Sequence, residues 1–148
     1  MNLTIGHPVH VVNKRALDAP EAGANIARVA GRLPLHASSA GLVLLAHADP
    51  ALRERVISAQ LAKIGPGTIT DPARLRRELA RIRRDGSVAA PASIEAVSTG
   101  IAVPIREAGR VIAALSVVLP HGSDPDRAIP ALSSAAKRIE AELRGSRA

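Results

Sequence analysis

Two apolar runs decide the fold: Thr99-Gly-Ile-Ala-Val-Pro-Ile-Arg106 and Arg110-Val-Ile-Ala-Ala-Leu-Ser-Val-Val-Leu119, with Glu107-Ala108-Gly109 between them. Both runs are rich in Ile, Val and Leu, and both have the length of a β-strand. The glycine between them adopts positive φ angles without strain, which a tight hairpin turn requires. The stretch therefore predicts two antiparallel strands joined by a hairpin turn that ends at Gly109.

An amphipathic helix is predicted on each side of this hairpin. The following helix spans Asp126–Arg144, and its apolar stripe consists of Ile129, Leu132, Ala136, Ile139 and Leu143. The preceding helix has Asp71 as its N-cap, Pro72 in its first position and Gly86 at its end. Its apolar stripe consists of Leu75, Leu79 and Ile82. In both helices the apolar residues recur at steps of three and four, so each buries one face.

The N-terminal half predicts strands and two further helices. The strands are expected at Asn2–Ile5, at Val9–Asn13 and around Ile26 and Val29 up to Gly31, with a loop over Leu17–Gly23. The stretch Leu35–His47 is apolar enough for a buried helix, and another helix is expected from an Asp49 N-cap to about Lys63. Mixed strands and helices in this order predict an α+β fold, in which helices flank an antiparallel sheet.

Length and composition limit the classes of protein. A chain of 148 residues, 47% of them hydrophobic, suits one globular domain. Without Phe, Tyr or Trp, the chain has no rings on which single-stranded bases can stack. Without cysteine, it has no disulfides and no thiolate metal site. We see neither a signal peptide nor a membrane-spanning run, so we expect a soluble, cytoplasmic protein without a metal or cofactor.

The net charge of +7 raises the alternative of non-specific nucleic-acid binding through the helix Arg74–Arg84. The arginines of that helix are Arg74, Arg76, Arg77, Arg81, Arg83 and Arg84. They surround most of the helix outside its apolar stripe, so we favour a solvated face. The linker Ile64–Thr70 before this helix is also too long for the turn of a helix-turn-helix.

Isolated polar residues raise a weaker enzymatic alternative. The sequence Ala37-Ser38-Ser39-Ala40-Gly41 is similar to a nucleophile elbow, which with His36 would make a hydrolase. That device needs a strand directly before the serine, and Pro34 and His36 stand there instead. A helix start with capping serines is the favoured interpretation. His7 and His10 lack a third ligand nearby and predict no metal site.

Three blocks in this order resemble the effector domain of IclR-type transcription regulators. They are Gly31-Arg-Leu-Pro-Leu-His-Ala37 with Gly41 and Leu44-Leu-Ala46, then Thr68-Ile-Thr-Asp71 with its helix, and then the Ile101–Val117 hairpin. The resemblance covers Val9 to Leu143. It implies a GAF-like antiparallel sheet flanked by helices, and a sensor that is not an enzyme.

The resemblance also implies a ligand pocket under a capping loop over Ala90–Gly100. The residues expected to line it are Leu33, Ser38, Ser39, Ala40, Ala90, Ser98, Thr99, Gly100, Ser116 and Val118. Ala90 and Val118 stand where the family often has polar side chains, so we expect a less polar pocket than in sensors of small oxo-acids. The expected effector is a small organic acid or an apolar metabolite.

Two further expectations come from the family. Its members form dimers or tetramers, so we expect a homo-oligomer. They also carry a winged helix-turn-helix before the effector domain, and nothing before Val9 can encode one. We therefore expect a single effector-binding domain over 1–148, which is a truncated gene product, the product of a wrongly assigned start, or a stand-alone sensor. DNA contact is expected only through a winged helix outside this chain.

Overall fold

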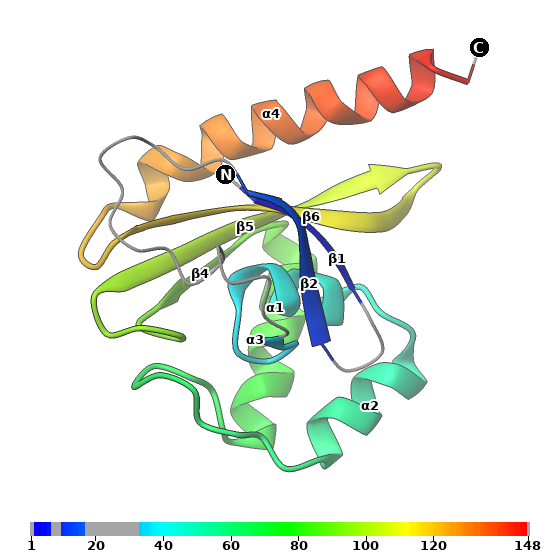
Figure 1. The fold of residues 1–148 in the computed structure, drawn as a ribbon. Helices are drawn as coiled ribbons and strands as arrows, with labels where there is room; N and C mark the ends of the chain where they lie inside the picture. Colours follow the sequence, from blue (N-terminus) through cyan, green and yellow to red (C-terminus); the bar gives the residue numbers. More distant parts are fainter. Residues whose placement is uncertain (1, 7–9, 17–32, 148) are drawn as a thin grey trace.

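A six-stranded antiparallel sheet with the strand order β3-β2-β1-β6-β5-β4 forms the centre of the fold (Figure 1). The structure is a computed structural model, which describes residues 2–6, 10–16 and 33–147, the first two ranges by their backbone alone. The strands are β1 Asn2–Gly6, β2 His10–Ala16, β3 Leu33–Pro34, β4 Val88–Pro91, β5 Ser98–Glu107 and β6 Arg110–Pro120. The helices are α1 Ser39–Ala46, α2 Pro50–Ser58, α3 Pro72–Asp85 and α4 Pro125–Gly145.

The hairpin β5–β6 is confirmed and is the longest pairing in the sheet. Its register runs from Ser98 opposite Pro120 to Glu107 opposite Arg110. Ala108 and Gly109 form the turn with φ angles of 49° and 77°. Because Glu107 already pairs with Arg110, the turn has two residues rather than the predicted three. Two consecutive positive φ angles are characteristic of the turn that matches the twist of a hairpin.

Helix α4 covers one face of the sheet (Figure 1). Its predicted stripe is confirmed, because Leu132 and Ala136 are buried and the other three residues pack beside them on the strands. On the strand side this cluster contains alternate residues of the hairpin: Ile101, Val103 and Ile105 from β5, and Ala113 and Leu115 from β6. A single strand alternates its side chains between faces, so the residues between them point away from α4.

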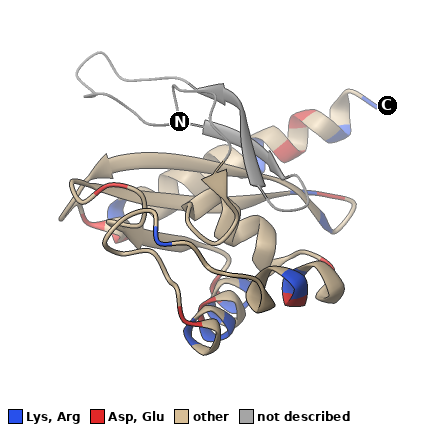
Figure 2. Cartoon of the chain, turned by 60° about the horizontal axis from the view of Figure 1, so that its bottom comes forward, with Lys and Arg blue, Asp and Glu red and all other residues tan. Residues whose placement is uncertain are grey.

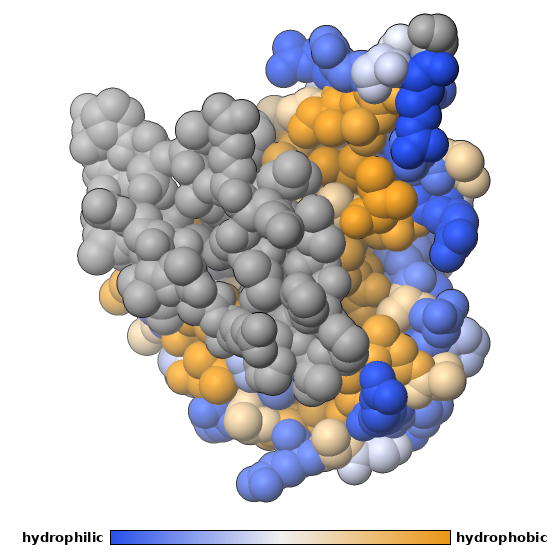
Figure 3. All heavy atoms as spheres, turned by 45° about the vertical axis from the view of Figure 1, so that its right-hand side comes forward, coloured by the Kyte–Doolittle hydropathy of each residue, from blue (hydrophilic) through white to orange (hydrophobic). Residues whose placement is uncertain are grey.

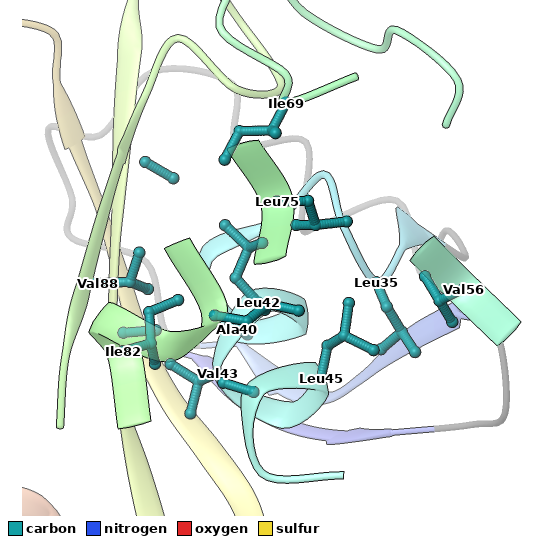
Figure 4. Close-up of a cluster of buried hydrophobic side chains, with 14 of the residues drawn as sticks. Leu35, Ala40, Leu42, Val43, Leu45, Val56, Ile69, Leu75, Ile82 and Val88 are labelled. Atoms are coloured by element: carbon teal, nitrogen blue, oxygen red, sulfur yellow. The ribbon is translucent and has the colours of Figure 1, made fainter. Parts of the chain in front are cut away.

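Helix α1 covers the opposite face of the sheet, and α3 packs against α1. Leu42, Val43 and Leu45 project from α1 into a cluster that reaches α3, β4 and α2 (Figure 4). The α3 stripe of Leu75, Leu79 and Ile82 is at most 1% exposed, as its spacing predicted. Asp71 caps α3 by accepting from the N–H of Arg74 at 2.7 Å, and Gly86 ends it in the left-handed conformation.

Three predicted elements have different bounds in the structure. The helix expected over Leu35–His47 starts only at Ser39, because Leu33–Pro34 pairs with β2 as a strand. Helix α2 ends at Ser58 instead of Lys63, since Ala59 is extended and Leu61 turns inward to 9% exposure. Asp49 occupies the N-cap of α2 but forms no side-chain capping bond.

Strand β4 was not predicted. The resemblance implied a loop over Ala90–Gly100, whereas Val88–Pro91 pairs with Ala102–Thr99 of β5, which places Ala90 opposite Gly100. Only residues 92–97 form the connection. The loop Leu17–Gly23 and the strand around Ile26 lie outside the described residues. In the described ranges, no helix is long and apolar enough to cross a membrane.

Candidate effector-binding site

The N-terminus of α1 lies directly on the sheet, and Gly100 is the reason it can. A Cβ atom at position 100 would stand 2.7 Å from the Ser39 Oγ and 3.2 Å from the Ser39 Cβ. Separations this short are repulsive, so a side chain at Gly100 would force the Ser39 hydroxyl to rotate and the helix start to shift by a few tenths of an ångström. Ser39 is 7% exposed at this contact. Two residues 61 positions apart, both predicted as pocket lining, are thus brought together.

Small side chains form the sheet face in front of α1. Ala90, Gly100 and Val118 lie in one row across β4, β5 and β6, because Gly100 pairs with both of the others. Ser116 lies in the next row, opposite Ala102, which packs in the α1 and α3 cluster. Alternation places Ser116 and Val118 on this same face. Val118 is 38% exposed and Ser116 only 5%, so the face has an open apolar end and a buried hydroxyl.

The helix start provides hydrogen-bond donors to this face. The Ser38 side chain accepts from the Gly41 N–H at 3.0 Å, and the Ser38 carbonyl accepts from Leu42. The N–H groups of Ser39 and Ala40 therefore have no partner within the helix. The first turn of α1 contains no acidic residue, so the positive end of the helix dipole is not offset by a carboxylate of its own. Such a helix start attracts an anion.

Two polar side chains fix the 92–97 connection beside the helix start, and the sequence reasoning had not selected either. The Ser93 hydroxyl donates to the carbonyl of Ala37, just before α1. The Thr68 hydroxyl donates to the Ser93 carbonyl at 2.6 Å and accepts from the Gly65 N–H at 2.8 Å. Thr68 belongs to the Thr-Ile-Thr-Asp block, and this block could have indicated its role. No feature of the sequence indicated the role of Ser93.

The remaining predicted residues are less central. Thr99 pairs with Leu119 and alternates onto the α4 face, so it does not share a face with Gly100. Ser98 lies on the Gly100 face at the start of β5, half-buried. Leu33 lies in the edge strand β3, beyond β1 and β2 from the hairpin. The side chain of Ala40 packs into the hydrophobic cluster, which leaves only its N–H for the site.

The two alternative functions find little support in the geometry. The His36 Nε2 lies 2.8 Å from the carbonyl of Ala62, a structural bond that occupies the proposed base. On α3, half of the arginines are in ion pairs: Arg76 with Glu54, Arg81 with Glu78 and Asp85, and Arg84 with Asp85. Figure 2 accordingly shows acidic residues interleaved with basic ones on α2 and α3. No cluster of three His, Asp or Glu side chains suited to a metal ion occurs in the described part of the chain.

The family model and the solved structures that resemble this chain indicate the same protein family. Residues 3–141 match the family model described as bacterial transcriptional regulator IclR C-terminal. An IclR homologue from Microbacterium hydrocarbonoxydans, solved in complex with 4-hydroxybenzoate, is 53% identical with a TM-score of 0.94, over 97% of this chain and 60% of that one. A double mutant of the PobR inducer-binding domain from Acinetobacter, solved with 3-hydroxybenzoic acid, is 27% identical with a TM-score of 0.83, over 94% of this chain and 86% of that one.

The Pca regulon regulatory protein of Pseudomonas putida is 38% identical over 91 residues, which are 60% of this chain and 31% of that protein. The chain thus spans less than two thirds of the length of this relative and of the Microbacterium homologue. The family consists of transcription regulators and not of enzymes, so the resemblance, the α+β fold and the non-enzymatic function are confirmed. The chain belongs to the IclR C-terminal family of bacterial transcription regulators.

Proposed function

We propose that these 148 residues act as one effector-sensing domain, which binds a small aromatic carboxylate of the hydroxybenzoate type in front of α1. The observation that carries the proposal is the contact of Ser39 with Gly100, which holds the α1 N-terminus on the sheet. The ligand carboxylate accepts from the N–H groups of Ser39 and Ala40, where a helix start favours an anion. The ring lies beside this contact, toward Val118 at the open end of the row.

The composition of this face favours an aromatic acid over a small oxo-acid. Ala90, Gly100 and Val118 provide no polar atom beyond their backbone, and Ser116 contributes a single hydroxyl. On such a lining, burial of apolar ligand surface contributes a favourable binding free energy of about 25 cal/mol per Å². Hydroxybenzoates occupy two of the similar structures. We therefore infer that the chain prefers a hydroxybenzoate to pyruvate or glyoxylate.

Calorimetric titration with 4-hydroxybenzoate, benzoate and pyruvate tests this proposal. We expect the hydroxybenzoate to bind most tightly and to raise the melting temperature. Gly100→Ala should weaken binding, because its Cβ meets Ser39 and displaces the helix start. Gly145→Ala is the matched control, since a Cβ there has no neighbour within 4 Å. Stabilisation by pyruvate alone would refute the aromatic assignment.

We also propose that the domain self-associates and that DNA contact is made by a winged-helix domain outside these residues. An apolar strip is exposed below the C-terminal end of α4 (Figure 3). Ile112 of β6 is also 41% exposed. A contiguous exposed apolar surface is a feature of interaction sites between proteins. Light scattering after size exclusion should show a dimer or larger. A monomer at high concentration would contradict the oligomer, and tight operator binding by the chain alone would contradict the separate DNA-binding domain.

A further inference from the structure

A cavity lies at the free edge of β4, beside α3. It has a volume of about 420 Å³ and lies between α3, the segment 67–69 and the strand β4. Leu42, Ile69 and Ala90 form its apolar wall, and all three are at most 9% exposed. Arg74, Glu78 and Arg81 of α3 also line the cavity. An apolar interior with a few charged groups is typical of a small-molecule site.

Among the charged residues that line the cavity, one cation has no ion pair with the described residues. Arg81 donates to both Glu78 and Asp85, so its charge is offset. Within residues 33–147 Arg74 forms no ion pair, and it stands in the first turn of α3, where the N-terminal helix dipole is also positive. A cation in this position is electrostatically unfavourable. An anion bound beside it would offset both the unpaired charge of Arg74 and the positive end of the helix dipole.

The edge of β4 adds backbone groups to the cavity. β4 pairs with β5 on one side only, and it is the edge of the sheet. The N–H of Ala92 donates to Ser98, which continues the ladder of Ala90 with Gly100. In an antiparallel pair the bonded residues alternate, so the N–H and carbonyl of Ala89 point to the free edge, where the cavity lies.

We propose that this cavity binds a monocarboxylate with a short branched apolar tail. The carboxylate pairs with Arg74 at the α3 end, and the tail enters between Leu42 and Ile69. The volume leaves room for such a molecule, and the lining has one guanidinium without an ion pair in the described part of the chain, which matches a single negative charge. Binding here does not depend on the proposed hydroxybenzoate function.

Occupancy of this cavity would influence the effector face, if the proposed function holds. Leu42 lies on α1 one turn after Ser39, and Ala90 belongs both to this cavity and to the row with Gly100. Ser93 also lines the cavity and holds Ala37 through its hydroxyl. A carboxylate here therefore touches the helix and the connection that shape the other site, which is a route for coupling between two ligands.

Titration of the ¹⁵N-labelled chain with isovalerate tests the proposal, and isovaleramide serves as the uncharged analogue. We expect isovalerate to shift the amide signals of Gly67, Ile69 and Ala89. Arg74→Gln should weaken the affinity about tenfold or more, the loss of one charge-assisted bond. Arg77→Gln is the matched control, because Arg77 is exposed on the same helix and does not line the cavity.

Three results would overturn the second site: shifts confined to Ser39 and Gly100, equal binding of isovaleramide, or an affinity unchanged in Arg74→Gln. The two proposals fail separately. Gly100→Ala should lose 4-hydroxybenzoate and keep isovalerate, whereas Arg74→Gln should do the reverse. Saturating isovalerate should change the Kd of 4-hydroxybenzoate about fivefold or more, and an unchanged Kd would remove the coupling.

Discussion

Substitution of Gly100 by alanine is the sharpest perturbation of the site. The new Cβ would lie 2.7 Å from the Ser39 Oγ and 3.2 Å from its Cβ, so one methyl group is forced into an occupied position. Overpacking of this kind costs about 1–3 kcal/mol. For a domain of this size each kcal/mol lowers the melting temperature by about 2–4 °C. Urea unfolding and thermal melting of Gly100→Ala, with Gly145→Ala as the control, measure this loss.

A double-mutant cycle identifies the cause of that loss. Ser39→Ala removes the oxygen at 2.7 Å and leaves the Cβ at 3.2 Å, so it should recover part of the stability of Gly100→Ala. We expect a coupling free energy of about 0.5–3 kcal/mol between the two positions. Two results would show that the helix start does not rest on the sheet at Gly100. One is a melting temperature of Gly100→Ala equal to that of Gly145→Ala, and the other is that the effects of Gly100→Ala and Ser39→Ala on the free energy of unfolding are additive. The proposed ligand site would then lose its main support.

Three further substitutions test the surroundings of the site. Burial, and then the positive charge of Arg106, lower the pKa of His47 at the end of α1 below the usual 6.5. Neutral His47 therefore contributes stability that is complete above about pH 6.5 and is lost as the pH falls through the lower folded pKa, and His47→Gln should flatten this dependence in pH-resolved melting. Ser93→Ala should cost about 1–3 kcal/mol in urea unfolding, because it leaves a buried carbonyl unpaired, whereas the exposed Ser134→Ala should cost almost nothing. Leu79→Ala opens a void in a position that is 1% exposed and should cost about 2–5 kcal/mol; a smaller loss would place α3 away from the core.

The elements that sequence reasoning found share strong local signals. The hairpin has long apolar runs and a glycine turn, and α3 has a capping aspartate, a first-turn proline and a closing glycine. β4 lacked such a signal, since Val-Ala-Ala-Pro has little intrinsic strand preference and becomes a strand only by pairing with β5. The end of α2 was missed for a related reason, because Leu61 leaves the helical path to reach the core.

Family resemblance and local sequence pattern each predict only part of the site. Resemblance gave Ser39, Gly100 and Ser116 as a set, and the structure places all three on or against one sheet face. It also gave Thr99, which strand alternation assigns to the α4 face once the register of β5 is known. No local pattern indicates that Gly100 must be glycine, because the atom that excludes a side chain belongs to Ser39, 61 residues away.

Because the chain has no aromatic side chains, the proposed ligand would itself contribute apolar contacts to the structure. A sheet face built from Ala90, Gly100, Ser116 and Val118 has no side chain larger than valine, and this chain has no Phe, Tyr or Trp that could pack on it. A ligand ring that buries its two faces there adds apolar contact that the protein lacks by itself. Its carboxylate would bond to the N–H groups of Ser39 and Ala40 while its ring rests on the strands, so the ligand would tie the start of α1 more firmly to the sheet. On the proposed function, effector binding would tighten α1 on the sheet, and the proposed oligomer would respond to this shift of α1 by a change in the arrangement of its copies.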